Sequence, residues 1–581
     1  MSTGERYDVV IIGAGHNGTT LAAYLARCGL SVCLLEERPE AGGAQENCDP
    51  IAGVHTSPHA VALYGGPAPG WEQLELWRYG ARMDWRALKE AGTGVLSLVH
   101  MTTEGCVRTP DSDLMAYGKL AGMMGSPPFT KDLLRAVFWC PPHPPEVELT
   151  AENIPFMQVY KQRQPDVWTK ELLEWSTWDL MDEYLECEAF KTFIAMAAWY
   201  SGAAGHFEGM AIPAFASVVL AILYTVGTVP MGGIHGYFHA IMRCALAHGA
   251  VIRTCCPVDE IIIRNGRAVG VRLRDNAACG EKKVWADKAV ISAADIKQTF
   301  LRMIGPQHLD PGLRKRIDDL SLKGGSIYVN HFLLREPLRH RPKYKEAELS
   351  GMYYPMDSRE IYYDHVMDVL GRQGNPTVPP ERVPWLRAGS ALIFSPFHRQ
   401  TTRPNTALEC SLEVYVPPPE YHVAGPDAIN KVKDEMNAYM VKAFSQVYEN
   451  LNSDNIIHHW AMTPYEQELR NTGMLGGTWY GIRQCRDQWW NERPLPELAR
   501  YRVPGIDGLY LCHQSSGHPG GLCLMAVPYN LMHILIEDGI AEPGDWWYPS
   551  PWYIPEKGKI SAIPHRSVSY THLRAHETVL D

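Results

Sequence analysis

The sequence has no excess of basic charge and no cysteine pair at the spacing of a metal or redox motif. Its 581 residues carry a formal net charge of -11. Nucleic acid binds basic surfaces, so we expect no nucleic-acid partner. The fourteen cysteines are scattered, and the adjacent pair Cys255 and Cys256 is poorly arranged for a structural disulfide. We therefore expect reduced, mostly buried thiols in a cytoplasmic protein.

Two further signals are missing. The first predicted strand begins at residue 7, so we expect no signal peptide. His235 and His239 lie one turn apart on a predicted helix, which is the spacing of a metal-binding pair, but no third ligand accompanies them. We expect no metal site.

The first forty residues carry a nucleotide-binding pattern. A strand over 7–12 leads into the G-x-G-x-x-G turn of residues 13–18, a helix follows over 21–28, and a second strand over 31–35 ends at Glu36. In such a βαβ unit the three glycines allow the tight turn, the approach to a pyrophosphate and close helix packing. The helix N-terminus offers free N–H groups to phosphates. Glu36 is placed to accept hydrogen bonds from an adenosine ribose.

Two short motifs follow that strand. Arg38 with Gly42 and Gly43 lies where the chain passes the pyrophosphate again, so the arginine is placed to pair with a phosphate. The alternative is a surface turn. His55 and His59 then flank a proline, and they either face the cofactor ring or satisfy local backbone groups.

After residue 60, segments typical of the cofactor domain alternate with two long insertions. Residues 61 to about 225 form a mainly helical insertion, and 306 to about 470 form a β-rich one with strands at 326–334, 390–394 and 408–416 and a helix over 427–448. The cofactor pattern resumes with a helix over 235–248, a strand at 250–254, a hairpin at 258–273 turning at Asn265 and Gly266, and a strand over 285–294. It resumes again with a strand at 508–512, a glycine-bearing loop at 513–521 and a helix over 529–537.

This order predicts an α/β fold in which a two-part Rossmann-like cofactor domain is interrupted by an α+β substrate domain. We assign residues 1–60, 230–305 and 500–540 to the cofactor domain, and 61–229 and 306–499 to the substrate domain. Residues 541–566 are an extension rich in Trp, Tyr and Pro that either wraps the surface or contacts a partner. Residues 567–581 resemble translated library-adapter sequence, and we predict that they are a non-native tail.

One apolar stretch raises the question of a membrane. Residues 210–229 carry no charge over twenty positions, which is long enough to span a bilayer. A span would place the two parts of the cofactor domain on opposite sides of the membrane. We therefore expect a buried helix, or one lining an apolar substrate channel, and keep a peripheral membrane contact as the alternative.

Together these motifs resemble those of the phytoene desaturase-like flavoproteins, and within them the group named after a pyridine nucleotide-disulphide oxidoreductase domain. The resemblance covers about residues 1–540. It implies FAD as the cofactor and oxidation or isomerisation of C–C bonds, often in isoprenoid-like substrates. It also implies that Val258 offers its backbone to the adenine, and that Pro519, Gly520 and Gly521 approach the flavin. By the same resemblance, the adenosine and pyrophosphate are lined by Gly13, Ala14, Gly15, Gly18, Glu36, Arg38, Gly42 and Gly43.

The chain departs from the family pattern near the flavin. His513 and Leu522 replace glycines, and Trp479 and Tyr480 replace a segment that often carries histidine. An imidazole titrates near neutral pH, so His513, His55 and His59 are the acid–base candidates. Trp479 and Tyr480 are candidates for the wall of the substrate site.

Three functions fit the sequence. The first is an FAD-dependent dehydrogenase or desaturase that moves a hydride from a C–H bond of a hydrophobic small molecule to flavin N5. The second is a flavin oxidase that uses O₂ and acts on an amine or another polar substrate, which the 17 Trp and 28 Tyr would suit. The third is a non-catalytic flavin-binding interaction protein, motivated by the changes at positions 513 and 522.

Overall fold

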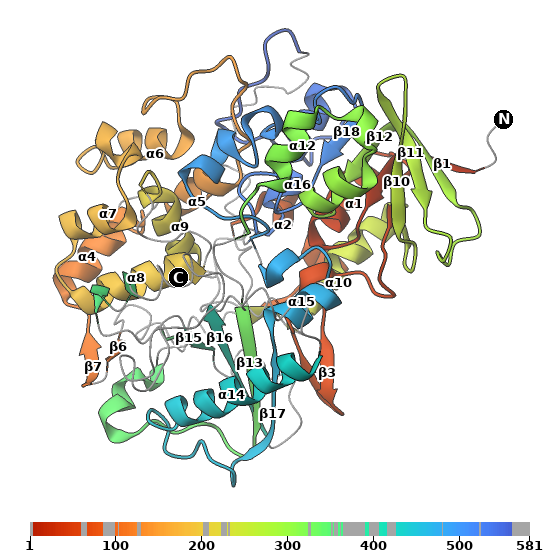
Figure 1. Ribbon diagram of the computed structural model, residues 1–581. Helices are drawn as coiled ribbons and strands as arrows, with labels where there is room; N and C mark the ends of the chain where they lie inside the picture. Colours follow the sequence, from red (N-terminus) through yellow and green to blue (C-terminus); the bar gives the residue numbers. More distant parts are fainter. Residues whose placement is uncertain are drawn as a thin grey trace.

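The computed structural model describes residues 4–559 with internal gaps (Figure 1). The gaps are 60–66, 85–98, 103, 125–128, 201–207, 222–228, 231–232, 323–326, 350–351, 354–357, 361, 364–389, 394–405, 415–425, 479 and 522–523. Trp479, Leu522 and the predicted tail at 567–581 therefore lie outside the described residues.

A seven-stranded sheet forms one half of the molecule. Its strands are β1 (Glu5–Ile12), β2 (Val32–Leu35), β9 (Val251–Arg253), β10 (Val258–Arg264), β11 (Arg267–Leu273), β12 (Lys283–Ser292) and β18 (Leu509–Leu511). Their order is β10-β11-β12-β1-β2-β9, and β18 pairs with the end of β12. Strands β9, β2, β1, β12 and β18 run parallel. The predicted α/β class is confirmed.

Both faces of this sheet are buried, which explains the continuous apolar runs of its central strands. Val9 and Ile11 pack toward the helices α1 (His16–Arg27), α10 (Gly233–Ala247) and α16 (Ala526–Glu537). Val10 and Ile12 pack into a second core on the other face, where α11 (Ile296–Gln298) and α12 (Pro311–Asp318) lie. The predicted hairpin is present as β10 and β11, and Asn265 and Gly266 adopt positive φ values of 50° and 73° at its turn.

A five-stranded sheet forms the second unit, in the order β14-β15-β16-β13-β17. Its strands are β13 (Ile327–Leu334), β14 (Met352–Tyr353), β15 (Ser390–Ile393), β16 (Ala407–Val414) and β17 (Ile456–Met462). Helix α14 (Pro426–Phe444) lies beside it (Figure 1), and the Tyr328 hydroxyl donates to Asn437 Oδ1 at 2.9 Å. The hairpin of β3 (Cys48–Ile51) and β4 (Val54–Thr56) packs against the sheet through Val54 and Leu333.

Helices fill the remaining side of the molecule (Figure 1). They are α4 (Asp111–Leu120), α5 (Thr130–Phe138), α6 (Pro155–Arg163), α7 (Thr177–Tyr184), α8 (Glu188–Tyr200) and α9 (Ala211–Ala221). Short elements connect them to the sheets: α2 (Pro69–Gln73), α15 (Pro464–Arg470), β5 (Met83–Asp84), β6 (Val99–Thr102), β7 (Gly105–Arg108) and β8 (Val229–Pro230). Residues 211–220 of α9 are buried, as expected for the first half of the apolar stretch, and residues 222–228 of that stretch lie outside the described residues. Among the described residues, no helix is both long and apolar enough for a bilayer crossing.

The C-terminal extension packs onto its own chain over residues 541–559. Trp546 stacks on Tyr24 of α1 with ring centroids 6.1 Å apart. The backbone N–H of Ser550 donates to Nε2 of His533 on α16 at 2.8 Å. The Gln73 side chain donates to the Tyr548 carbonyl at 2.9 Å. Of the two predicted roles, wrapping the surface is the one that these contacts support.

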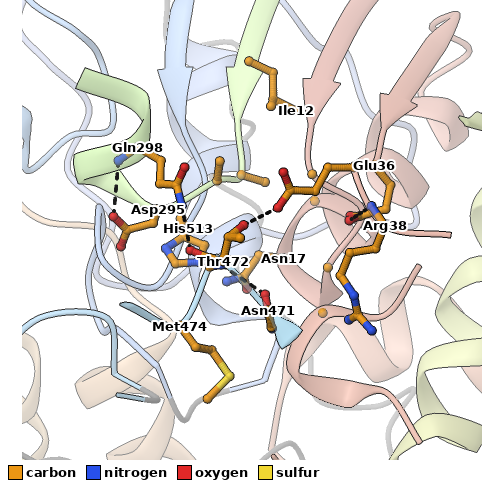
Figure 2. Close-up of a pocket in the computed structure, with 18 of the residues that line it drawn as sticks. Ile12, Asn17, Glu36, Arg38, Asp295, Gln298, Asn471, Thr472, Met474 and His513 are labelled. Carbon is orange, nitrogen blue, oxygen red and sulfur yellow. Dashed lines mark hydrogen bonds between the residues drawn. The ribbon is translucent and has the colours of Figure 1, made fainter. Parts of the chain in front are cut away.

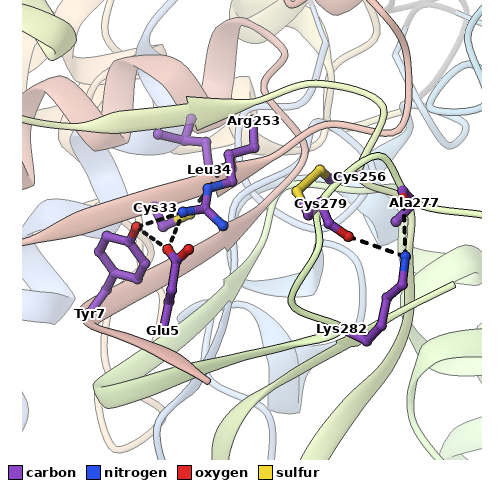
Figure 3. Close-up of a disulfide and its surroundings, with 9 residues drawn as sticks. All are labelled: Glu5, Tyr7, Cys33, Leu34, Arg253, Cys256, Ala277, Cys279 and Lys282. Atoms are coloured by element: carbon purple, nitrogen blue, oxygen red, sulfur yellow. Dashed lines mark hydrogen bonds and ion pairs between the residues drawn. A yellow bond between two sulfur atoms is a disulfide. The ribbon is translucent and has the colours of Figure 1, made fainter. Parts of the chain in front are cut away.

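A disulfide joins Cys256 to Cys279, so the expectation of reduced thiols throughout is wrong (Figure 3). The partner is not the adjacent cysteine but one that the β10–β11 hairpin brings back across the sheet edge. The Ala278 N–H donates to the Cys255 carbonyl at 2.8 Å, and the Arg274 N–H donates to the Pro257 carbonyl at 2.9 Å. These bonds hold the two cysteines with a Cα–Cα distance of 6.2 Å. Ten other cysteines among the described residues are free.

Candidate functional site

A pocket of about 850 Å³, including its open mouth, follows the carboxyl edge of the seven-stranded sheet. Strands β2, β1, β12 and β18 end side by side along this edge. Within two residues of these strand ends the pocket is lined, in the same order, by Glu36, Gly13, Ala293 and His513. Neighbouring strands lie about 4.8 Å apart, so roughly 14 Å separates the Glu36 side, called the β2 end, from the His513 side, called the β18 end. Ligands of open α/β sheets bind in such a crevice.

The glycine turn after β1 gives the pocket its backbone floor. Gly13 has a φ of 94°, and its N–H donates to the Leu35 carbonyl at 2.8 Å. A Cβ on Gly18 would lie 2.2 Å from the Gly13 carbonyl oxygen, so only glycine allows α1 to pack this closely. Helix α1 begins at His16 with no acidic residue and no side-chain cap in its first turn. Its first N–H groups and the positive end of its dipole fit a pyrophosphate.

The second glycine motif closes on the first. The Gly42 N–H donates to the Ala14 carbonyl at 3.0 Å, and a Cβ on Gly43 would lie 3.0 Å from Gly15 Cα. The two turns thus face each other with only backbone between them. This is the close approach expected of the Gly42 and Gly43 motif, and it leaves room for a ligand over Gly15.

Glu36 occupies the predicted place at the β2 end. Its carboxylate accepts the N–H of Ala14 at 2.8 Å and the N–H of Arg38 at 3.0 Å, and the residue is 8% exposed. Burial raises the pKa of Glu36, which these two N–H groups partly offset. Each carboxylate oxygen keeps a second lone pair, so the group can still accept a ribose hydroxyl.

Arg38 belongs to a buried charge cluster. Its guanidinium pairs with Glu46, which also pairs with Arg470 and with His59 Nε2, the latter at 2.9 Å. Burial would raise the pKa of Glu46, but the bonds and charges of His59 and Arg38 lower it to about 2. Arg38 Nη1 is buried and has no hydrogen-bond partner among the described residues. Because Arg38 also lines the pocket, this donor fits a phosphate.

The structure does not bring His55 or His59 to the pocket. His59 is held by Glu46 and lies 3.5 Å from Gln467 Oε1. His55 is on β4, pairs with Asp49, and has a side chain 53% exposed. His59 thus has a structural role and His55 lies on the surface, so the geometry does not support either histidine as an acid–base group.

The adenine side of the pocket includes Val258, as the resemblance implies. The chain before it is tied to the β2 end, because the Cys256 N–H donates to the Glu36 carbonyl at 2.7 Å and the Cys255 N–H donates to the Arg38 carbonyl at 2.9 Å. The disulfide therefore anchors the segment that carries Val258.

At the β18 end, the pocket is built by side chains (Figure 2). His513 is 9% exposed, and its Nδ1 lies 2.8 Å from the Ser515 hydroxyl. Asp295 caps α11 through Oδ1, which accepts the N–H groups of Lys297 at 2.8 Å and Gln298 at 3.4 Å. Burial raises the pKa of Asp295 to about 6, although nearby donors oppose the shift. Burial lowers the pKa of His513 to about 3 and that of His16 to about 4.

The loop that carries Pro519, Gly520 and Gly521 lies behind this end and does not line the pocket. A Cβ on Gly520 would lie 2.5 Å from Gln484 Nε2 and 2.8 Å from Arg493 Nη2. The guanidinium of Arg493 is fully buried and donates to four carbonyls, those of Tyr480, Gln488, Gln514 and Gly517. Burial lowers the pKa of Arg493 to about 9, so it stays charged at neutral pH. It holds the loop from behind.

Other residues near this loop have packing roles. His518 Nε2 donates to the Val137 carbonyl at 2.9 Å and its ring packs edge-on against Trp489 and Trp490. Tyr480 is buried and donates to the Trp199 carbonyl at 3.2 Å, so it does not line the pocket.

Sequence reasoning missed Asp295, Ser515 and the segment 471–474, all of which shape the β18 end. One signal was available for Asp295, because an aspartate after a strand and before a short helix is a typical N-cap. The segment 471–474 carries no motif. It reaches the pocket through tertiary contacts, such as the bond from Gln298 Nε2 to the Thr472 carbonyl at 2.9 Å.

Comparisons with known proteins agree with this geometry. A family model described as FAD dependent oxidoreductase matches residues 8–104. The chain is 24% identical to the pyridine nucleotide-disulfide oxidoreductase domain-containing protein 2 of Rattus norvegicus, over 92% of this chain and 94% of that protein. It is 23% identical to one of the subunits of the limonene dehydrogenase of Castellaniella defragrans, over 94% of this chain and 97% of that protein.

A solved structure shares the fold. The cyclohexylamine oxidase from Brevibacterium oxydans aligns with a TM-score of 0.52 at 13% identity, covering 91% of this chain and 97% of that one. The glycine cradle, Glu36 and the free donor of Arg38 fit an FAD, and the matched family is FAD-dependent. The prediction of an FAD-dependent oxidoreductase domain is confirmed by the family model over residues 8–104, and the chain is similar to these curated relatives over most of its length.

Proposed function

We propose that the protein is an FAD-dependent dehydrogenase that removes a hydride from a C–H bond of a hydrophobic, isoprenoid-like molecule. The observation that carries the proposal is the pocket that runs from a dinucleotide cradle at the β2 end to a buried β18 end in which the imidazoles stay neutral. The substrate class is supported by two facts. The chain aligns over nearly its whole length with a limonene dehydrogenase subunit. The helical half has an apolar interior, since α9 carries no charged residue.

The chain's own residues would hold the cofactor and keep its site dry. Glu36 would bind the adenosine, and the first turn of α1 with Arg38 would bind the pyrophosphate. Bound FAD supplies the acceptor for the hydride and its two electrons. His513, with its pKa lowered to about 3, would not take up a proton at neutral pH. Asp295, with its pKa raised to about 6, is a pocket carboxyl whose charge changes near neutrality.

The test is an anaerobic reduction of the FAD-loaded protein. We expect isoprenoid hydrocarbons with allylic C–H bonds, limonene among them, to remove the absorbance of oxidised flavin, while cyclohexylamine leaves it unchanged. A Gly18→Val variant, which we expect not to bind FAD, controls for non-specific reduction. Reduction by the amine with release of peroxide in air would overturn the proposal in favour of an amine oxidase.

The third hypothesis has an outcome of its own in this experiment. A bound flavin that no chemical reductant can reduce would indicate a non-catalytic protein. The structure gives that hypothesis less support than the sequence did, because the aromatic extension expected to dock a partner is packed on Tyr24 and His533 of the same chain.

A further inference from the structure

Two polar atoms at the β18 end have no hydrogen-bond partner among the described residues. One is Nε2 of His513, whose other ring nitrogen is engaged by Ser515. The other is the buried Oδ2 of Asp295, whose companion oxygen caps α11. Both residues line the same pocket and come from neighbouring strand ends, those of β12 and β18. Buried polar atoms in native proteins nearly always have partners, so Oδ2 of Asp295 points to a ligand in the pocket that His513 also lines.

The hydrogen bonds around His513 determine which nitrogen carries its proton. The backbone N–H of Ser515 lies 3.2 Å from Nδ1, and a backbone N–H can only donate. Nδ1 is therefore the acceptor, and the proton of the neutral ring is on Nε2. The Ser515 hydroxyl accepts the Ile296 N–H at 2.9 Å and lies 2.8 Å from Nδ1, and its hydrogen bond to the Asp295 carboxyl ties the two residues together. The fold thus holds His513 as a donor.

The donor is directed into the pocket. A Cβ on Gly473, another lining residue, would lie 3.3 Å from His513 Nε2, so the absence of a side chain at position 473 leaves space beside Nε2. Figure 2 shows His513 and Asp295 on the same side of the pocket. Asp295 Oδ2 supplies an acceptor beside it. A hydroxyl group can accept from the one and donate to the other.

We infer that His513 and Asp295 form a donor–acceptor pair that positions the cofactor by its ribityl hydroxyls, with Ser515 fixing the imidazole. Strand β1 lies between this pair and Glu36, which is placed to bind the adenosine ribose at the opposite end. The other polyol of FAD is the ribityl chain, and it is therefore the group that we assign to His513 and Asp295. The inference rests on the FAD assignment within the proposed function and not on the substrate. His513 is then a positioning residue that replaces the family's glycine, and not an obstruction.

Binding of two ligands to the apoprotein tests this inference. FAD carries the ribityl chain, whereas ADP carries only the adenosine and pyrophosphate. For His513→Gly we expect FAD to bind about three- to tenfold more weakly, the size of one lost hydrogen bond, with ADP binding unchanged. His513→Gln keeps an N–H donor and should stay within about twofold of the wild type. Glu36→Ala should weaken both ligands, and His308→Gln, outside the pocket, should weaken neither.

Each other result has a distinct meaning. Tighter FAD binding by His513→Gly would show that the imidazole obstructs the site and would overturn the inference. An equal loss of ADP affinity would also overturn it, because the contact would then be at the adenosine side. Failure of the wild type to bind FAD while it binds ADP would instead contradict the proposed function.

A spectroscopic readout tests the tautomer without a mutation. In the ¹⁵N NMR spectrum of histidine-labelled protein, His513 should show a protonated Nε2 and an unprotonated Nδ1, and FAD should shift the Nε2 resonance more than ADP does. A protonated Nδ1 would contradict the assignment. Ser515→Ala should raise the population of the other tautomer and weaken FAD binding by about two- to fivefold.

Discussion

Two buried carboxylates near opposite ends of the cofactor pocket have pKa values shifted in opposite directions. Glu46, behind the β2 end, is surrounded by Arg38, Arg470 and His59, and its pKa is lowered to about 2. At the β18 end, burial raises the pKa of Asp295 to about 6, and the donors that oppose the shift are uncharged: the Ser515 hydroxyl and the N–H groups of Lys297 and Gln298. Each end keeps a buried atom that a ligand would satisfy, Arg38 Nη1 at the β2 end and Asp295 Oδ2 at the β18 end, but only the carboxylate behind the β2 end is neutralised by cationic side chains.

We expect the largest effect from a substitution that disturbs the backbone packing of the β2 end. In Gly18→Val the new Cβ would meet the Gly13 carbonyl oxygen at 2.2 Å, so α1 must move away from the glycine turn. We expect loss of FAD and ADP binding and a loss of about 3 kcal/mol or more in the free energy of unfolding. Urea unfolding and ligand titration measure both. Gly280→Ala, where no atom lies within 4 Å and φ is not positive, is the matched control. Near-normal binding by Gly18→Val would show that this end is not built by close packing.

The next effect concerns the charge cluster behind that end. Glu46→Gln leaves Arg38 and Arg470 without their carboxylate, and we expect a loss of about 3 kcal/mol at neutral pH. The folded-state pKa is about 2 against an ordinary value of 4.5, so the unfolded chain binds more protons between these values. The stability that Glu46 contributes is therefore full above about pH 4.5 and is lost as the pH falls toward 2. Urea unfolding of both proteins at several pH values should show their difference shrinking over that window, and a constant difference would contradict the charge argument.

The disulfide offers a smaller change at the same end. Cys279→Ser opens a link between residues 23 apart in sequence, and the entropy of the unfolded chain predicts a loss of about 3 kcal/mol for a closed loop of this size, with smaller values common. A reductant should remove most of the difference between the two proteins in urea unfolding. Cys106→Ser, at a free cysteine on β7, serves as the control. We also expect weaker ADP binding, because the bridge anchors the segment before Val258.

This contrast between the ends also explains what could be predicted from sequence. Gly13, Gly18, Gly42, Gly43 and Glu36 act through backbone geometry that a local motif specifies, and the structure places them together as expected. The long strands, the Asn265–Gly266 hairpin and the buried α9 were predictable for the same reason, since period and turn chemistry are local.

The β18 end could not be predicted in this way. Asp295, Ser515 and Gly473 come from three distant segments, and their juxtaposition depends on how β12 and β18 pair. The bridge from Cys256 to Cys279 depends likewise on the return of a hairpin. His513 could be recognised as a departure from a family pattern, but its donor role depends on Ser515 and on the register of the loop that follows β18.

The smallest effect is the most specific to the β18 end. Asp295 has a pKa near 6 in the folded state against an ordinary value of 3.8, so here the folded protein binds more protons between the two values. Stability should therefore fall as the pH rises from about 4 to about 6, by on the order of 2 kcal/mol, the opposite sign to that of Glu46. Asp295→Asn keeps a side-chain cap for α11 and removes the titrating carboxyl. The variant should therefore become more stable to urea relative to the wild type as the pH rises across this window. FAD should reduce the gain, because hydroxyl donors to Oδ2 favour the carboxylate and lower its pKa, and ADP should not. If the relative stability of the variant rises equally with FAD, with ADP and with no ligand, Asp295 does not contact the cofactor and its role is only to cap α11.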